Sequence, residues 1–356
     1  MSYRLLITGG AGFVGSTLAL AFKRDHPDWI VTAFDNLKRR GSELALRRLR
    51  TGGILFNHGD VRSAEDIEAA GPAELLIDCS AEASVHTGYQ DNPRYAVATN
   101  LGGTVNCLEH LRRHGGDLVF LSTSRVYPIA RLRGLPLERQ AGRFGLPCGA
   151  GGPGWSEEGI DETLPLGGSR SLYGATKLAS ELLIEEYREM YGLRAIINRC
   201  AVLTGPWQMG KVDQGFVVLW LARHLYGGDL AYIGFGGEGL QVRDILHIDD
   251  LYDLIGDQLK EFARHSAGAY NVGGGKTSSL SLRELTDWCQ RLTGRSLQFG
   301  REEETRPADI PYYVSNCRAV QSATGWQPRR PVWKILEDIH RWLTDHKKTV
   351  QPILES

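Results

Sequence analysis

A glycine-rich turn near the start of the chain limits the fold more than any other feature. It reads Thr8-Gly9-Gly10-Ala11-Gly12-Phe13-Val14-Gly15, follows an apolar strand at 4–8 and precedes helical spacing at 16–24. Glycines at 9, 12 and 15 form the GxxGxxG spacing of a dinucleotide site. In such a site Gly9 permits a tight turn, Gly12 lets the backbone approach a pyrophosphate, and Gly15 lets helix and strand pack closely.

Apolar runs and amphipathic stretches alternate through the first 200 residues. Near-continuous apolar strands separated by helices predict an α/β fold with a Rossmann-type doubly wound parallel sheet covered on both faces. The expected strands are 4–8, 30–34, 54–58, 73–79, 117–122 and 193–198, and the expected helices are 16–24, 63–69, 95–114 and 173–191.

The alternation is interrupted at 128–170, a stretch rich in Gly, Pro and Arg, and it loosens after residue 200. We expect 1–200 to form a dinucleotide-binding domain with a loop excursion at 128–170, since long loops are usually functional or disordered. Residues 201–356 then form most of a smaller, discontinuous substrate domain with interleaved segments.

Composition excludes several other classes of protein. The chain has 356 residues, with 41 Lys plus Arg and 42 Asp plus Glu, a formal net charge of −1 that does not suit nucleic acid or anionic lipid. Its six cysteines show no CxxC spacing, so we expect reduced thiols, no metal site and a cytoplasmic protein. No apolar run reaches the roughly 18 residues of a membrane span, and we expect no signal peptide.

An acidic residue marks the expected ribose site. Asp35 stands 20 residues after Gly15, where a carboxylate accepts both hydroxyls of an adenosine ribose and favours NAD over NADP. The basic run Lys38-Arg39-Arg40 leaves open a 2′-phosphate site, or simply a solvated turn. Asp60-Val61 follows the third strand and suits the adenine ring, but Asp60 equally fits a helix cap before Ser63.

Tyr173 and Lys177 are four residues apart, and hence on one face of the expected helix. A phenol has a pKa near 10, and a nearby ammonium lowers it, so this Tyr becomes a usable base. Ser122-Thr123-Ser124 ends the fifth strand at the sheet's carboxyl edge, where open α/β sheets bind ligands. One hydroxyl there can bond the oxygen that Tyr173 deprotonates.

Taken together, these motifs resemble the extended short-chain dehydrogenases/reductases that modify nucleotide sugars. Within that family the chain most resembles the CDP-paratose (CDP-tyvelose) 2-epimerases. The resembling stretches are 80–86, 122–127, 170–177, 199–215 and 241–250. The resemblance implies a catalytic set of Thr123, Tyr173 and Lys177, tightly bound NAD that is regenerated in each turnover, and a homodimer through the helices before Tyr127 and after Tyr173.

The expected cofactor site also includes residues beyond the glycines, Asp35 and the catalytic pair. Asn100 is placed beside the cofactor by the resemblance, although a helix-capping Asn remains open, and Cys200 lines the nicotinamide pocket without acting as a nucleophile. The full set of additional cofactor residues is Phe13, Val14, Asn36, Asp60, Val61, Ser80, Ala81, Asn100, Cys200 and Val202.

The expected substrate site draws on both parts of the chain. Arg243 and Arg306 are candidates for a diphosphate, because a guanidinium forks onto phosphate oxygens, and Asp309 for the nucleotide ribose. The loop Asp213-Gln214-Gly215 fits substrate binding and equally a helix cap. Residues after strands four and five should face the sugar, namely Ser84, His86, Ser124 and Arg125; His86 is either a second proton carrier or a positioning residue.

The residues after Thr123 indicate the type of reaction. Sugar-nucleotide 4,6-dehydratases resemble Thr-Asp-Glu here, because eliminating water needs an additional acid and base, whereas this chain has Ser124 and Arg125. We therefore expect oxidation of an alcohol and reduction of the ketone from its other face, at C2 of CDP-paratose. A UDP-sugar 4-epimerase, a dehydratase or net oxidoreductase, and a non-catalytic NAD-binding regulator remain as alternatives.

Overall fold

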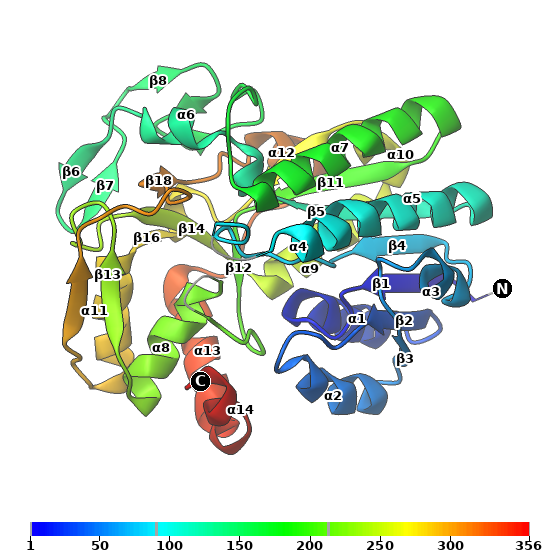
Figure 1. Ribbon diagram of the computed structural model, residues 1–356, viewed down its shortest axis with the longest axis horizontal. Helices are drawn as coiled ribbons and strands as arrows, with labels where there is room; N and C mark the ends of the chain where they lie inside the picture. Colours follow the sequence, from blue (N-terminus) through cyan, green and yellow to red (C-terminus); the bar gives the residue numbers. More distant parts are fainter. Residues whose placement is uncertain (1, 90–91, 212–213, 356) are drawn as a thin grey trace. The chain divides into compact units, whose positions relative to one another are not determined.

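The computed structural model describes residues 2–89, 92–211 and 214–355, and Figure 1 shows its elements. The chain divides into two compact units, each made of three segments. The first unit contains Met1–Val126, Leu172–Arg199 and Tyr252–Ala269, and the second contains Tyr127–Ser171, Cys200–Leu251 and Tyr270–Ser356.

A seven-stranded parallel sheet forms the centre of the dinucleotide-binding fold and confirms the predicted Rossmann-type architecture. Its strand order is β15-β11-β5-β4-β1-β2-β3, so the order reverses between β1 and β4. The strands are β1 (Arg4–Thr8), β2 (Ile30–Asp35), β3 (Leu55–His58), β4 (Leu75–Asp78), β5 (Asp117–Thr123), β11 (Ala195–Cys200) and β15 (Ala269–Val272). Ligands of such sheets bind at the carboxyl ends of the strands beside that reversal.

Burial explains why these strands are almost continuously apolar. All four residues of β4 are buried, as are Leu5, Leu6, Ile7 and Thr8 of β1. β1 pairs in parallel with both β2 and β4, in the register Leu6↔Thr32 and Leu6↔Leu76. Helices cover both faces of a sheet of this kind, so its central strands do not alternate between apolar and polar residues.

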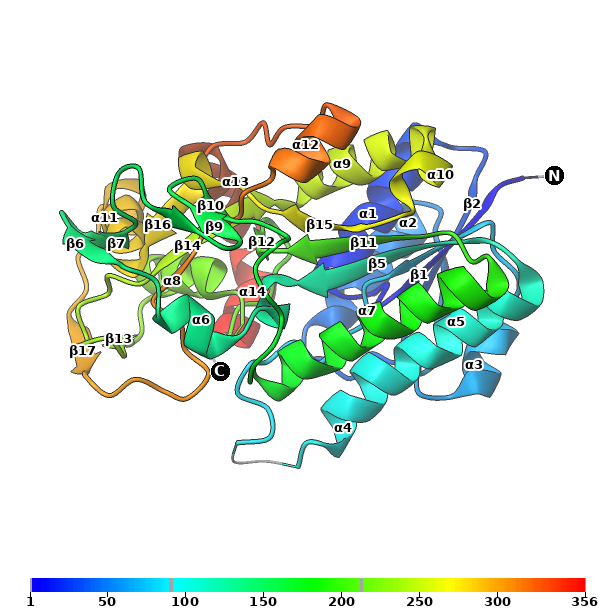
Figure 2. The same ribbon diagram turned by 90° about the horizontal axis from the view of Figure 1, so that it is seen from above.

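The helices of the first unit lie on the two faces of this sheet (Figure 2). α5 (Gly103–His114) and α7 (Leu172–Tyr191) run side by side along one face, next to α3 (Ala64–Ala69) and α4 (Arg94–Val97). α1 (Phe13–Asp25) covers the other face, and α2 (Ala45–Thr51) packs against it.

The expected helix 95–114 is not one regular helix. A π-helical turn, Ala98–Gly102, separates α4 from α5 and carries Asn100. Turns of this type insert one residue into a helix and often occur at functional sites.

One apolar cluster ties the sheet to the helices on the α5 and α7 face. Phe120 and Leu76 from the strands meet Leu108 and Leu111 of α5 and Ile184 of α7, all almost fully buried. This cluster fixes α7 against β5, which places the expected catalytic helix beside the end of a central strand.

The second unit consists of small sheets and helices. Its strands are β6 (Glu138–Gln140), β7 (Arg143–Gly145), β8 (Gly151–Gly152), β9 (Trp155–Ser156), β10 (Gly159–Ile160), β12 (Val202–Thr204), β13 (Leu230–Ile233), β14 (Val242–His247), β16 (Ser279–Ser281), β17 (Phe299–Glu302) and β18 (Tyr312–Tyr313). Its helices are α6 (Ile129–Arg133), α8 (Phe216–Tyr226), α11 (Leu282–Thr293), α12 (Arg318–Thr324), α13 (Val332–Asp345) and α14 (Lys347–Leu354). Residues 128–170 thus carry α6 and five short strands, and Leu132 and Ile160 in them are fully buried.

One helix belongs to both units. α9 (Ile248–Lys260) begins in the second unit and continues into the first, where α10 (Phe262–His265) follows it. Among the residues that the structure describes, no helix combines the length and the apolar character needed to cross a bilayer.

Candidate functional site

The glycine turn has the backbone geometry that the spacing predicts. Gly9 has φ +62°, and a Cβ there would lie 2.8 Å from the carbonyl oxygen of Cys79. A Cβ on Gly15 would lie 2.3 Å from the carbonyl oxygen of Gly9, so only glycine lets α1 start this close to the turn. Sequence reasoning missed Gly10, whose Cβ would lie 2.6 Å from the Cα of Ala33 in β2.

The N-terminus of α1 suits a pyrophosphate. Gly12 is its N-cap residue and supplies no side-chain cap, and the first turn, which includes Phe13 and Val14, contains no acidic residue. The N–H groups at the start of a helix have no partner within the helix, and the helix dipole favours an anion there. The residues present therefore fit the diphosphate of NAD.

Asp35 lies at the end of β2 against the glycine turn. Its carboxylate accepts hydrogen bonds from the N–H of Ala11 at 3.1 Å and of Leu37 at 2.7 Å. Burial raises the pKa of Asp35, and the N–H groups of Leu37, Ala11 and Gly12 oppose that rise. A carboxylate anchored in this way fits the ribose hydroxyls of NAD.

Asp60 does not cap the helix that follows it. Ser63 is the N-cap of α3 and accepts the N–H of Asp66 at 3.1 Å. The Asp60 carboxylate instead accepts Asn36 Nδ2 at 2.9 Å and pairs with Arg62 at 2.6 Å. The Arg62 guanidinium holds the pKa of Asp60 well below its usual range. The helix-cap interpretation of Asp60 is therefore wrong, and the adenine role stays a prediction, as does that of the buried Val61.

Two cations lie over one aromatic ring beside this carboxylate. Lys38 Nζ is 3.9 Å and the Arg62 guanidinium 4.7 Å from the ring centroid of Tyr95. A cation over a ring is attracted by the quadrupole of the ring, and the exposed Lys38 makes such a contact.

Asp78 connects the ends of β1 and β4, and sequence reasoning missed it. Its Oδ1 accepts the hydroxyls of Thr8 at 2.7 Å and Ser80 at 2.6 Å, and its Oδ2 accepts Thr104 Oγ1 at 3.2 Å. Ser80 is thus held at the reversal of strand order, next to the exposed Ala81. A charged residue at the end of an otherwise apolar strand was the available signal.

Asn100 lies inside the π-helical turn and caps no helix, so that interpretation is wrong. Its Oδ1 accepts the N–H of Glu82 at 2.8 Å, and its Nδ2 donates to the Glu82 carbonyl and to Thr176 Oγ1, both at 3.1 Å. The side chain therefore ties the loop after β4 to α7.

The three expected catalytic residues come from β5 and α7. Thr123 ends β5, is nearly buried, and its Oγ1 accepts the N–H of Arg125 at 3.2 Å. The neighbouring Ser122 hydroxyl donates to Glu181 within the interior, which supports Thr123 as the reactive hydroxyl. α7 packs against β5 and against the turn Ser124–Val126.

Tyr173 and Lys177 lie on the first turns of α7. Tyr173 is half-buried, whereas Lys177 is only 2% exposed. The Lys177 Nζ lies 4.3 Å from the ring centroid of Phe120. Burying an ammonium is costly unless it is paired or hydrogen-bonded, so the place of Lys177 one turn from the phenol of Tyr173 supports the expected role in tuning that phenol.

A buried ion pair continues the same face of α7. Glu181, four residues after Lys177 and 1% exposed, pairs with Arg199 of β11 at 2.7 Å. Sequence reasoning missed this pair. The repeated spacing of four from Tyr173 through Lys177 to Glu181 was the available signal.

The expected sugar-facing residues of the first unit lie on loops after β4 and β5. The His86 N–H donates to Ser84 Oγ at 3.3 Å, and the His86 ring lies 6.4 Å from that of Tyr89. Ser84, His86, Ser124 and Arg125 are all partly exposed.

In the second unit the two expected phosphate ligands have protein partners. Arg243 of β14 donates to the carbonyls of Val242 and Ile310, each at 2.7 Å. Arg306 pairs with Asp309 at 2.9 Å. Sequence reasoning missed Arg133 of α6, which donates to the carbonyls of Asp309 at 2.9 Å and Arg306 at 2.8 Å and so braces their loop.

The other expected residues of this unit also have defined places. Cys200 is buried, and Val202 lies in β12 opposite Ile245. Gln214 exchanges main-chain hydrogen bonds with Lys211, and Gly215, not Gln214, is the N-cap of α8. Asp213 lies outside the described residues.

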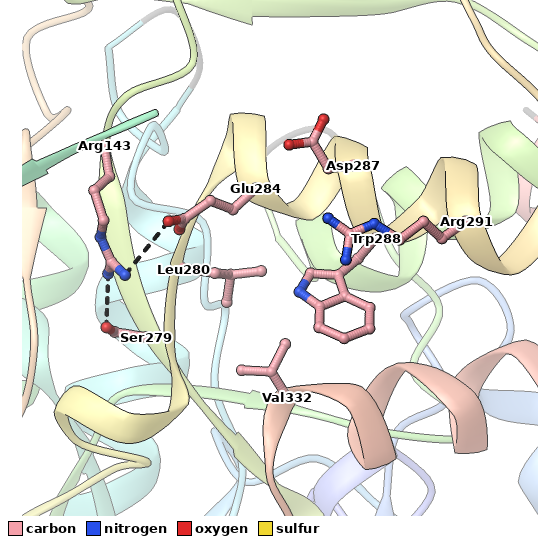
Figure 3. A pocket seen from close by; sticks show the side chains of 8 residues that line it. All are labelled: Arg143, Ser279, Leu280, Glu284, Asp287, Trp288, Arg291 and Val332. Carbon is pink, nitrogen blue, oxygen red and sulfur yellow. Dashed lines mark hydrogen bonds and ion pairs between the residues drawn. The ribbon is translucent and has the colours of Figure 1, made fainter. Parts of the chain in front are cut away.

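A cavity of about 200 Å³ lies beside α11 in the second unit (Figure 3). Its lining includes two Arg and two acidic residues, so its formal charges cancel. Arg143 there already pairs with Glu284 at 3.5 Å and donates to Ser279 at 2.7 Å. None of the expected substrate residues lines this cavity, which does not suit a diphosphate.

Comparison with known proteins places the chain in a family. Residues 5–273 match the NAD dependent epimerase/dehydratase family. The chain is 28% identical to CDP-paratose 2-epimerase of Salmonella typhi, over 95% of this chain and 98% of the relative. It is 31% identical to dTDP-glucose 4,6-dehydratase of Mycolicibacterium smegmatis, over 99% of this chain and 97% of the relative.

The chain is also similar to a solved structure of an NAD-containing enzyme. UDP-glucose 4-epimerase from Thermus thermophilus, in complex with NAD, is similar with a TM-score of 0.75 and 26% identity, over 94% of this chain and 98% of that chain. Since the family match covers most of the sequence and the relatives span nearly all of it, this chain belongs to the NAD-dependent epimerase/dehydratase family and uses NAD as its cofactor.

Proposed function

We propose that the protein is an epimerase of a nucleotide sugar and inverts C2 of CDP-paratose to form CDP-tyvelose. The similarity to CDP-paratose 2-epimerase over nearly the full length supports this substrate. Overall identity does not decide between epimerase and dehydratase, because a 4,6-dehydratase is similarly close. The residues at the end of β5 distinguish between these two reactions.

Thr123 is followed by Ser124 and Arg125, with no carboxylate in the turn that packs against α7. Removing water from a sugar needs an acid and a base besides the group that serves the alcohol oxygen. Thr123, Tyr173 and Lys177 together serve one alcohol oxygen only. This observation favours epimerisation over dehydration.

The residues then have the following roles. NAD, held by the glycine turn and Asp35, would supply a reversible hydride acceptor for the sugar carbon. Tyr173, as phenolate, takes the proton of the C2 hydroxyl while Thr123 donates a hydrogen bond to the same oxygen. Lys177 stabilises the phenolate and bonds a ribose hydroxyl of the cofactor. After the 2-keto sugar turns its other face to the cofactor, Tyr173 returns the proton.

We propose that different parts of the chain bind the two ligands. We assign residues 1–200 to NAD, through the glycine turn, Asp35 and Asn100, and 201–356 mainly to the nucleotide sugar. The sugar must rotate during the reaction, so affinity has to come from the nucleotide, for which Arg243, Arg306 and Asp309 are the candidates. The remaining sites proposed are Cys200 and Val202 for NAD and Ser84, His86, Ser124, Arg125 and Gln214 for substrate.

We also propose that the protein is located in the cytoplasm and forms a homodimer. All six cysteines are free, as in a reducing compartment. Apolar side chains lie exposed on α4 and α7, namely Val97, Leu182, Met190 and Tyr191. A dimer through these helices would cover them. Leu182→Glu should halve the mass measured by light scattering, and a wild-type protein of monomer mass would contradict the dimer.

The deciding experiment is a product assay without added cofactor. Purified protein is incubated in D₂O with CDP-paratose, CDP-glucose or UDP-glucose, and NMR identifies the inverted carbon. Inversion at C2 of a CDP-sugar without deuterium at C2 supports the proposal. Inversion at C4 of UDP-glucose would support the alternative suggested by the Thermus thermophilus structure. Loss of water would show a dehydratase, and NAD binding with no turnover would show a regulator.

A further inference from the structure

Three potential metal ligands from α3 and α5 lie close together, apart from every residue assigned above. Glu68 comes from α3, and His110 and His114 come from α5. One ligand atom from each residue lies within 4.8 Å of the others. His114 Nε2 is 2.5 Å from Glu68 Oε1, and His110 Nδ1 is 3.5 Å from Glu68 Oε2.

His110 is the unusual member of this cluster. It is 2% exposed, and neither of its ring nitrogens has a hydrogen-bond partner of normal geometry among the described residues. A buried polar group without a partner costs free energy, and such groups in folded proteins call for an explanation, an ion being one. Glu68 and His114 are more exposed, so their side chains can shift to share an ion with His110.

The position of this cluster excludes a role for its residues in the proposed reaction. Asn100 lies just before α5, at the sheet edge where the strands end, whereas His110 and His114 lie in the last turns of that helix. At 1.5 Å per residue, His110 is about 15 Å from Asn100 along the helix. The cluster is therefore at the opposite end of α5 from the proposed cofactor site.

We propose that Glu68, His110 and His114 bind a divalent transition metal ion, Zn²⁺ being the ion they suit best. Two imidazole nitrogens and a carboxylate oxygen are a common Zn²⁺ ligand set, with bonds of about 2.0–2.2 Å and water in the fourth position. The spacing of four puts both His on one face of α5, and Glu68 joins that face from α3. The ion would act as a clip between the two helices.

The competing explanation is a His–Glu ion pair without metal. Such a pair accounts for His114 and Glu68, since their side chains already form a short hydrogen bond. It explains His110 less well, because His110 Nδ1 lies 3.5 Å from Glu68 Oε2 and makes no hydrogen bond of normal geometry with it. A metal ion would take one ligand atom from each of the three residues, including one ring nitrogen of His110.

The test uses the full-length protein without an affinity tag, stripped of metal and titrated with ZnCl₂ by calorimetry and with CoCl₂ by visible absorption. The wild type should bind one ion per chain, and bound Co²⁺ should show the d–d bands of a nitrogen- and oxygen-ligated ion. His114→Ala and Glu68→Gln should each weaken binding by at least about tenfold. Both side chains are exposed enough for these variants to fold, unlike the buried His110.

Matched controls separate the site from adventitious binding. Glu65→Gln removes an exposed carboxylate from the same helix, and His340→Ala removes an imidazole from α13; both should bind as wild type. Saturating Zn²⁺ should raise the midpoint of thermal unfolding of wild type and of the controls, but not of His114→Ala, because an ion that binds only the folded state stabilises it. Absence of stoichiometric binding, or equal affinity in His114→Ala, would overturn the proposal.

Discussion

Asn100 donates a hydrogen bond from Nδ2 to Thr176 Oγ1 at 3.1 Å, across 76 residues of sequence. Thr176 lies between Tyr173 and Lys177 in chain order, so this bond holds the first turns of α7. The same amide also bonds both main-chain groups of Glu82. One buried side chain thus positions the proposed catalytic helix and the loop after β4.

Asn100→Ala should lower both stability and turnover. It leaves the N–H and carbonyl of Glu82 without their partner, a loss of about 1–3 kcal/mol in the free energy of unfolding, and it frees the start of α7. Urea unfolding and the product assay described above measure the two effects. Asn106→Ala, which removes the single bond from Asn106 to the Val61 carbonyl, is the control and should cost less; equal losses would contradict a special role for Asn100.

Tyr173→Phe should abolish turnover while NAD stays bound. The change removes the proposed proton acceptor and leaves the glycine turn and Asp35 intact, so the rate should fall about 10²–10⁴-fold. Initial rates and the NAD content of purified protein are measured together. Tyr187→Phe, on the same helix, removes a hydroxyl bonded to Glu109 and should keep full turnover. An active Tyr173→Phe protein would rule out Tyr173 as the base.

Asp35→Ala should shift cofactor preference from NAD toward NADP. Loss of two charge-assisted hydrogen bonds to the ribose should weaken NAD binding by about 100-fold or more. The 2′-phosphate of NADP would no longer meet a carboxylate and would lie near Lys38. Fluorescence titration of protein stripped of cofactor gives both affinities, with Asp28→Ala, an exposed carboxylate, as control. An unchanged ratio of affinities would remove Asp35 from the ribose site.

Glu181→Gln should destabilise the first unit strongly. The change leaves the buried Arg199 guanidinium without its counter-charge, which typically costs about 3–5 kcal/mol. Thermal and urea unfolding measure the loss. Glu185→Gln, an exposed carboxylate on the same helix, should stay within about 0.5 kcal/mol of wild type. If the two variants proved equally stable, the ion pair would contribute little.

The sequence predicted the first unit better than the second, for a physical reason. Strands such as β1 and β4 are buried on both faces, so their apolar runs end within about two residues of their true limits. The glycine turn is readable because φ > 0 at Gly9 and the close approach at Gly15 demand particular residues. In the second unit β8, β9 and β10 are only two residues long and show no periodicity that a sequence could reveal.

Hydrogen bonds and ion pairs between residues far apart in the sequence were not predicted either. The contacts among Ser122, Glu181 and Arg199 form only when the chain folds. The residues next to each of them in the sequence do not indicate its partners. The Asp78 network is similar, since Thr8 and Thr104 are far from it in sequence. Such contacts follow from the packing of α7 and α5 on the sheet, which periodicity alone does not specify.

Asp244→Asn should change how stability depends on pH. Burial raises the pKa of Asp244 to about 6, against about 3.9 in an unfolded chain. The folded state therefore binds the proton more tightly, and stability falls as pH rises from about 4 to 6, then stays at that lower level.

The variant lacks this loss, because Asn carries no charge to bury. Relative to wild type, Asp244→Asn should gain about 2–3 kcal/mol between pH 4 and pH 7. Urea unfolding at both values provides the comparison, and Gly275 can still donate to the new side chain as it now does to Asp244 at 3.1 Å. Parallel pH profiles of the two proteins would show that the Asp244 carboxyl does not titrate in this range.

The π-helical turn at Ala98–Gly102 lies between α4 and α5. It determines how far the side chains of α5 are rotated about the helix axis relative to those of α4. Removing a single residue there would restore regular α-helical winding and rotate everything downstream by about 100°. Cys107, Leu108 and Leu111 would leave the apolar cluster, while the metal-ligand candidates on α5 would turn away from α3. Indels at this point should therefore be among the least tolerated in the chain, for a reason separate from the hydrogen bonds of Asn100.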